Sequence, residues 1–185
     1  VTDIHGNLPA LKAVLADIAR RGADVVVSLG DILSGPLMPA ETADFLIDLD
    51  LPTIRGNHER QLLTYAPERM GASDAFAAAA ISGRHRAWLE GLPVDLWLSD
   101  EVYLCHGSPM GDMIYFLEDV DATGVHPATP EQVEERAGDC PARLILCGHT
   151  HTPHVAELAD GRLVVNPGSV GLQAYEDDHW FPHRV

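Results

Sequence analysis

The sequence predicts an α/β fold, because short apolar strands alternate with helical segments and the strands end in glycine-flanked Asp, Asn or His residues. Residues 24–29 (DVVVSL) are a β-branched run of the kind found in strands buried on both faces. Residues 8–18 place apolar side chains at helical spacing. This alternation predicts parallel strands joined by right-handed crossovers, within one domain spanning residues 1–185.

The N-terminal part predicts two strand–helix units and a third strand. Residues 1–4 form a strand that leads into a helix, where Pro9 suits the first turn and Gly22 is the predicted stop. A second helix is predicted over residues 40–49, before a short strand at residues 52–54. Because a strand usually has about 5–6 residues, we expect the first strand to be incomplete at the N-terminus.

Residues 59–92 are predicted to be mostly helical, with an alanine-rich helix at residues 75–81. Beyond them, the sequence predicts strands at residues 102–105, 143–147, 154–158 and 162–166, and a helix at residues 131–137. Asp160-Gly161 separates the last two strands and predicts a β-hairpin. The rest of residues 112–139 is predicted to be irregular. Residues 176–185 show no strand pattern, and we expect the C-terminus to be incomplete.

The charge balance restricts the partners. The formal net charge is -16, from 12 basic and 28 acidic residues, so the surface repels long nucleic acid. It leaves a small phosphate ester open as a substrate. No apolar run is long enough for a membrane span. The three cysteines are an odd number without paired spacing, so they do not suggest a disulfide framework. This predicts a reducing, cytoplasmic setting.

Five polar clusters follow the predicted strands, and each contains or adjoins a glycine. They are Asp3-Ile4-His5, Gly30-Asp31, Gly56-Asn57-His58-Glu59, His106-Gly107 and Gly148-His149-Thr150-His151. In an open parallel sheet, ligands bind at the carboxyl ends of the strands. Asp, Asn and His are the ligand types that borderline divalent metals prefer. The clusters therefore predict a metal centre at one sheet edge. In an extended segment, Asp3 and His5 would point to the same side, and so would His149 and His151.

Each cluster taken singly has an ordinary structural explanation. A lone Asp or Asn beside glycine is commonly a turn or helix-cap residue. A lone His is more often a satisfied core or surface residue than a ligand. The metal hypothesis is favoured because one cause explains all five clusters, whereas the structural explanation must apply to each of them independently.

In these five blocks, in their order along nearly the whole chain, the sequence resembles the calcineurin-like metallophosphoesterases. The resemblance implies a four-layer α/β/β/α sandwich with two divalent metal ions at one edge. It also implies the ligands. Asp3, His5 and His151 would hold the first ion, Asn57, His106 and His149 the second, and Asp31 would bridge both.

Three phrases are similar to the small bacterial and archaeal branch of this family: residues 2–11 (TDIHGNLPAL), 106–109 (HGSP) and 166–171 (NPGSVG). This branch implies a phosphodiesterase for small or nucleotide-type phosphodiesters, with Mn as the favoured metal and Fe, Zn, Ni or Co as alternatives. Homo-oligomers are common in it. Protein Ser/Thr phosphatases carry a V-D-R-G segment after G-D, and its Arg clamps phosphate. Here Gly30-Asp31 is followed by Ile32-Leu33-Ser34, which disfavours that activity.

The predicted mechanism is in-line attack on phosphorus by a hydroxide shared between two ions. His58 is the candidate catalytic residue, stabilising the transition state or protonating the leaving oxygen; the alternative is a structural histidine on a loop. Asn57, His58 and Asn166 are the predicted substrate contacts, although Asn166 also fits a simple turn. The remaining five histidines are predicted to lie outside the site: His85, His126, His154, His179 and His183.

Two other functions stay open. One is a phosphomonoesterase or a protein phosphatase. The other is a non-catalytic scaffold that retains the fold, like a subunit of the retromer sorting coat. A scaffold would tolerate the loss of a ligand or of His58, and both are intact here.

Overall fold

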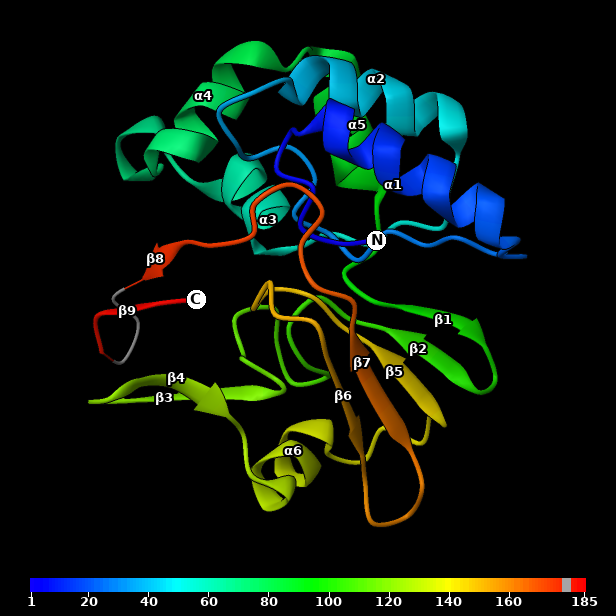
Figure 1. Ribbon diagram of the computed structural model, residues 1–185. Coiled ribbons are helices and arrows are strands. Elements are labelled where there is room, and N and C mark those ends of the chain that lie inside the picture. The colour runs from blue at the N-terminus through cyan, green and yellow to red at the C-terminus, as the bar shows by residue number, and fades with distance from the viewer. Residues whose placement is uncertain (178–180) are drawn as a thin grey trace.

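The computed structural model describes residues 1–177 and 181–185, so His179 lies outside the described residues. Figure 1 shows a helical layer above the extended N-terminal segments, then a β-sheet, then a helix below it. Among the described residues, no helix is long and apolar enough to cross a membrane.

The upper layer contains five α-helices and one 3₁₀ turn. They are α1 (Leu8–Arg21), α2 (Pro39–Leu49), α3 (Asn57–Thr64), the turn Pro67–Arg69, α4 (Ala72–Ala80) and α5 (Gly83–Gly91). The Asn7 side chain accepts a hydrogen bond from the Ala10 N–H and caps α1. Gly22 ends α1 with φ 78°, as predicted.

The second layer consists of extended segments at residues 1–4, 27–32 and 52–54. Backbone N–H groups of Leu29, Asp3 and Ile54 donate to Val1, Gly30 and Ser28 at 3.0, 3.1 and 3.0 Å. The segments therefore lie side by side, but regular β-pairing is limited to the parallel bridge between Ser28 and Thr53. The predictions of strands at residues 1–4, 24–29 and 52–54 are wrong. The first segment turns left-handed at Asp3, the second turns left-handed after its end at Gly30 and Asp31, and the third pairs only through Thr53.

The third layer is a five-stranded sheet in the order β1-β2-β5-β7-β6. Its strands are β1 (Leu96–Ser99), β2 (Val102–Leu104), β5 (Leu144–Leu146), β6 (His154–Glu157) and β7 (Leu163–Asn166). β2, β5 and β7 run parallel, and β1 and β6 pair antiparallel at the edges. The antiparallel β6–β7 pair confirms the predicted Asp160-Gly161 hairpin, whereas β1 was not predicted.

Three hydrophobic clusters separate the four layers. The first joins the upper helices to Ile4 and Ile32. The second lies between the extended segments and the sheet, where Leu29 and Ile54 pack with Leu104. The third joins the sheet to α6 (Pro130–Ala137). The α/β/β/α sandwich is thereby confirmed, because each cluster is the core between two successive layers.

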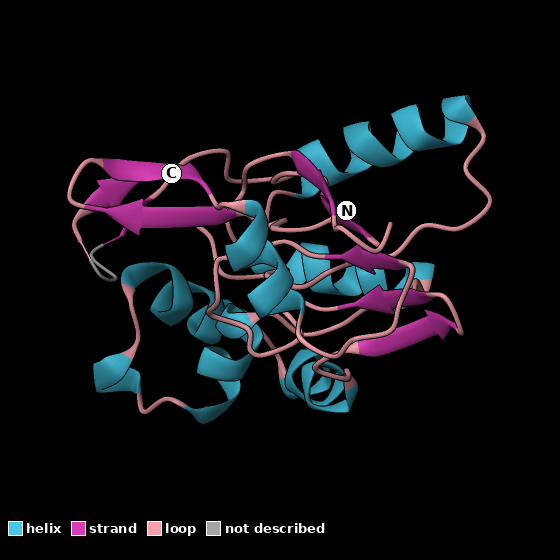
Figure 2. Ribbon diagram, turned by 90° about the horizontal axis from the view of Figure 1, so that it is seen from below, coloured by secondary structure: helices cyan, strands magenta, loops and turns pink. Residues whose placement is uncertain are grey.

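Two small hairpins lie outside this sandwich. β3 (Glu118–Asp121) pairs with β4 (Gly124–Pro127), and β8 (Glu176–Asp177) pairs with β9 (His183–Arg184). Figure 1 shows β3 and β4 apart from the five-stranded sheet, and the view from below in Figure 2 shows one group of strands at the left, apart from the others. The prediction that these regions lack strands is wrong. Their pairing partners lie close in the sequence, but the segments are too polar to show a β pattern.

Candidate metal centre

Six of the seven predicted metal ligands form two buried groups. One contains Asp3, His5 and His151, and the other contains Asp31, His106 and His149; in each group the candidate ligand atoms lie within 4.8 Å of one another. The seventh residue, Asn57, is also buried, and its Oδ1 lies 3.0 Å from His106 Nε2. The structure therefore brings together residues that are far apart in the sequence.

Backbone hydrogen bonds place these residues. The His5 N–H donates to the Asp31 carbonyl at 3.0 Å, which aligns the first two clusters. The Gly148 N–H donates to the His106 carbonyl at 2.7 Å, which aligns two neighbouring strand ends of the sheet. Asp3 and His149 meet across the layers, where the His149 N–H donates to Asp3 Oδ2 at 3.2 Å. The centre thus lies where the second layer meets the third.

The backbone at the predicted ligands differs from the extended geometry expected from their spacing. Five of them have a positive φ: Asp3 (53°), His5 (48°), Asp31 (51°), His149 (69°) and His151 (58°). The expectation of extended Asp-x-His and His-x-His segments is wrong. Their side chains converge because the chain turns at each ligand, which is a strained conformation for residues other than glycine.

Two glycines let these turns approach one another. A Cβ on Gly56 would lie 2.2 Å from Asp31 Oδ1, and a Cβ on Gly148 would lie 2.1 Å from Thr2 Oγ1. Neither contact is sterically allowed for a larger residue. Glycine therefore has a direct steric reason at these two positions.

Hydrogen bonds to backbone carbonyls orient two of the imidazoles. His5 Nδ1 donates to the Ser34 carbonyl at 2.6 Å, and His106 Nδ1 donates to the Leu29 carbonyl at 2.7 Å. This assignment follows from the carbonyl partner, which can only accept. It leaves Nε2 of each ring facing the other candidate ligands, as in protein metal sites where a second contact fixes the histidine tautomer.

Of the six buried side-chain polar atoms without a hydrogen-bond partner among the described residues, three belong to candidate ligands: Asp3 Oδ1, His149 Nε2 and His151 Nδ1. Asp3 Oδ1 does lie 3.4 Å from His151 Nε2, within ion-pair range. An unsatisfied buried polar atom costs about 1–3 kcal/mol. Carboxylate and imidazole atoms left unpaired in this way fit divalent cations, which bind to their lone pairs.

Burial and charge set the protonation states in the centre. Burial lowers the pKa of His5, and it lowers the pKa of His149 to about 4, so both rings are neutral at pH 7. Burial also opposes the charge on His106, but Asp31 and Asp3 outweigh it and raise its pKa to about 10. The Asp31 carboxyl has a pKa well below its usual value, because the nearby histidine charges outweigh its burial. The carboxylate is therefore ionised and available to a cation.

His58 lies beside this centre and is held by Asp74. His58 Nδ1 is 2.7 Å from Asp74 Oδ1, and the backbone N–H of His58 donates to Asp31 Oδ1 at 3.0 Å. Burial lowers the pKa of His58, but Asp31, Asp74 and Glu59 outweigh it and raise the pKa to about 9. The ring is thus held as a proton donor. Asp74 was not predicted from the sequence, because an acidic residue in the first turn of a helix is common without any functional role.

Glu59 is the second residue that sequence reasoning left without a role. Its side chain is 0% exposed and accepts hydrogen bonds from the N–H groups of Asp31, Ile32 and Gly56 at 2.8, 2.8 and 2.9 Å. Its place three residues after Gly56 is a capping-box position, which could have indicated this contact. Glu59 therefore ties the Gly30-Asp31 turn to the start of α3.

Glu59→Ala is expected to destabilise the protein by at least about 3 kcal/mol. Three buried N–H groups would lose their acceptor, and each loss costs about 1–3 kcal/mol. Urea unfolding followed by circular dichroism measures the difference. Glu90→Ala, at an exposed position of α5, is the matched control and should change stability by less than about 0.5 kcal/mol. Equal stability of the two variants would contradict this structural role of Glu59.

A cavity of about 320 Å³ opens onto the centre. Its lining includes His5, Asp31, Asn57, His149 and His151 together with His58. Its outer walls include Gln61, Met113, Leu172 and Tyr175. The predicted substrate contacts Asn57 and His58 therefore face a space large enough for a small ligand.

Asn166 lies elsewhere. Its side chain is 2% exposed; the amide Nδ2 donates to the Gly148 carbonyl at 2.8 Å, and Oδ1 accepts from the Gly168 N–H at 2.9 Å. It is not among the residues that line the cavity. A direct contact between Asn166 and substrate stays a prediction, and the contacts shown here support the Gly148-His149 turn.

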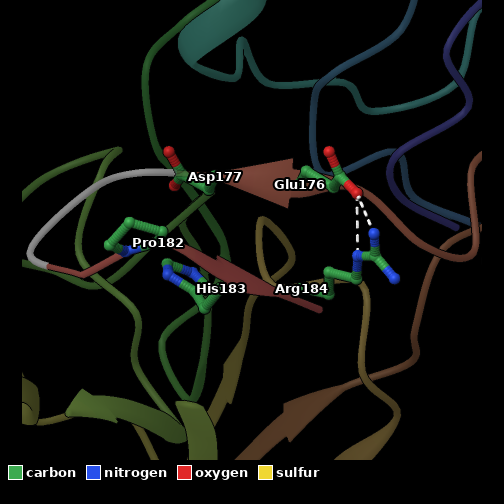
Figure 3. Close-up of a pocket in the computed structure, with 5 residues that line it drawn as sticks. All are labelled: Glu176, Asp177, Pro182, His183 and Arg184. Carbon is green, nitrogen blue, oxygen red and sulfur yellow. Dashed lines mark hydrogen bonds and ion pairs between the residues drawn. The ribbon is translucent and has the colours of Figure 1, made fainter. Parts of the chain in front are cut away.

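A second hollow of about 560 Å³ lies at the C-terminal hairpin. Figure 3 shows its lining residues, with Arg184 paired to Glu176 and His183 beside Pro182. It shares Glu176 and Asp177 with the smaller cavity but holds none of the predicted ligands. The smaller cavity is therefore the candidate active site, because several candidate ligands and His58 line it together.

Comparison with known proteins supports the same interpretation. Residues 1–180 match the model of the calcineurin-like phosphoesterase superfamily domain. The uncharacterized protein MJ0912 of Methanocaldococcus jannaschii is 28% identical over 195 aligned residues, which cover 92% of this chain and 74% of that protein.

Two solved structures have a similar fold over 100% of this chain. A metallophosphoesterase from Sphaerobacter thermophilus is 26% identical, with a TM-score of 0.72 and 86% of its chain covered. The hypothetical protein PH1004 from Pyrococcus horikoshii OT3 is 19% identical, with a TM-score of 0.76 and 85% of its chain covered. At that identity, the second structure supports the fold alone.

Proposed function

Because the chain belongs to the calcineurin-like phosphoesterase superfamily, we propose that it is a dimetal phosphodiesterase that cleaves small or nucleotide-type phosphodiesters. The superfamily is dimetal-dependent, and the structure contains two candidate ligand groups. The observation that carries the proposal is that members of both groups and the proton donor His58 line one cavity.

In this proposal the seven predicted residues act as the ligands. Asp3, His5 and His151 would hold the first ion, Asn57, His106 and His149 would hold the second, and Asp31 would serve both. When bound, two divalent ions supply positive charge for the phosphoryl oxygens and lower the pKa of a water towards neutrality. Mn is the favoured metal, and mixed N and O ligands also suit Fe, Zn, Ni and Co.

His58 supplies the proton in this proposal. Its Nδ1 is engaged by Asp74, so Nε2 is the nitrogen free to donate to the leaving oxygen. A positioned proton donor of this kind contributes about 10²–10⁴-fold to the rate. The contact with Asp74 also orients the His58 ring, because the Asp74 side chain is buried, at only 4% exposed.

The cavity favours a diester over a monoester. None of its lining residues is Lys or Arg, within the part of the chain that the structure describes. A monoester dianion carries a second negative charge, and no Lys or Arg side chain among the described residues lines the cavity to offset it. The same lack of an arginine disfavours a protein phosphatase, whose phosphate clamp the sequence also lacks.

Hydrolysis of bis(4-nitrophenyl) phosphate and 4-nitrophenyl phosphate, measured side by side with added Mn²⁺, tests the proposal. We expect kcat/KM to be at least about tenfold higher for the diester, a difference of about 1.4 kcal/mol in transition-state stabilisation. EDTA should abolish the activity, and Mn²⁺ should restore it. A higher value for the monoester would indicate a phosphomonoesterase. Bound metal without hydrolysis of either ester would indicate a scaffold.

A further inference from the structure

Glu118, in β3, has a buried carboxylate that the proposed chemistry does not use. It is 3% exposed, yet it comes from the acidic hairpin outside the four-layer sandwich. Glu118 Oε2 accepts from the Thr150 hydroxyl at 2.5 Å, and Oε1 accepts from His154 Nδ1 at 3.1 Å. A carboxylate is costly to bury without such partners, so these two contacts determine its position.

Thr150 lies between two of the candidate ligands, His149 and His151. Both histidines have a left-handed backbone, with φ 69° and 58°. This conformation costs about 1–2 kcal/mol for a residue other than glycine, and it persists only where the surroundings enforce it. The turn therefore needs an external restraint at or near Thr150.

The Thr150 hydroxyl is held from both sides. It donates its one proton to Glu118 and accepts from Asn166 Nδ2 at 3.0 Å. Asn166 also binds the Gly148 carbonyl, directly before the turn. With one donor and one acceptor contact fixed, the hydroxyl has a single orientation, and the backbone between the two histidines is held with it.

We propose that Glu118 is a positioning residue that holds the His149–His151 turn in its metal-binding shape through the Thr150 hydroxyl. This inference rests on the ligand roles in the proposed function. It assigns a task to the β3–β4 hairpin, a segment with no sequence motif. Contacts that orient metal ligands typically change metal affinity by about 10–100-fold when removed.

Isothermal titration of the metal-depleted, full-length chain with Mn²⁺ tests this role without reference to hydrolysis. Glu118→Gln and Thr150→Val should each weaken Mn²⁺ binding by about 10–100-fold. Thr150→Ser keeps the hydroxyl and should bind Mn²⁺ within about threefold of the wild type. Asp119→Asn is the matched control, because Asp119 lies on the same strand but pairs with Arg136 of α6; it too should stay within about threefold.

The rise of Tm on adding Mn²⁺ is a second readout, and it should shrink in Glu118→Gln and Thr150→Val alone. Affinities of these two variants within about threefold of Asp119→Asn would overturn the proposal. If Glu118→Gln does not fold, the contrast between Thr150→Val and Thr150→Ser decides. A wild-type chain that binds Mn²⁺ but cleaves no ester would contradict the phosphodiesterase function and leave this inference standing. A chain that binds no Mn²⁺ would overturn both.

Discussion

Asp31→Asn is expected to reduce metal binding and to lower kcat/KM by about 10³-fold or more. Asparagine keeps Oδ1, which can still accept the hydrogen bond from the backbone N–H of His58. The substitution therefore removes the negative charge but leaves the side-chain shape almost unchanged. The buried carboxylate that is proposed to lie between the two ions would be lost. Metal charge stabilises the transition state by several kcal/mol, and each 1.4 kcal/mol is about tenfold in rate.

Metal content by elemental analysis and diester hydrolysis measure this effect together. Asp17→Asn makes the same change of charge at an exposed position of α1, where the carboxylate pairs with Arg20 and Arg21. It should leave both measurements unchanged. Wild-type metal content and activity in Asp31→Asn would remove this residue from the proposed centre.

His58→Ala is expected to lower kcat by about 10²–10⁴-fold while the metal content stays that of the wild type. The ring is proposed as the proton donor and is not among the proposed ligands. Its loss should therefore affect turnover without emptying the centre. The loss should be larger for an alkyl diester than for a nitrophenyl diester, because nitrophenolate leaves without needing a proton.

His126→Ala provides the comparison for His58. His126 is in β4, its side chain is 39% exposed, and it lies near Asp121. That variant should keep wild-type turnover for both esters. A His58→Ala variant with full activity would show that another group protonates the leaving oxygen. Loss of metal from His58→Ala would instead indicate a ligand role for this histidine.

The sequence predicted the residues of the centre better than their geometry. Asp3, Asp31, His106 and His149 could be found because each follows an apolar run and adjoins a turn, a pattern set by local chemistry. Whether they bind metal stays a prediction. The left-handed backbone at the ligands could not be foreseen, because it arises from the close packing of turns that are distant in the sequence.

The contacts that orient the centre were harder to predict. Asp74 reaches His58 only because α4 packs beside α3, and nothing local to either helix indicates this contact. Glu118 lies in a strand of Glu, Asp and Val, a composition that disfavours β-structure. Its burial depends on Thr150 and His154, which follow 32 and 36 residues later. Such long-range partners carry no periodic signal along the chain.

The left-handed residues also restrict which side chains evolution can use at this centre. Among residues other than glycine, Asp, Asn and His tolerate this region of backbone space best. The five left-handed ligands are two aspartates and three histidines. Glutamate and cysteine can also coordinate divalent metals, but they lack this conformational tolerance. Coordination chemistry and backbone shape therefore select the same few amino acids, so even a replacement that retains a metal-binding group, such as Asp3→Glu, would strain the chain.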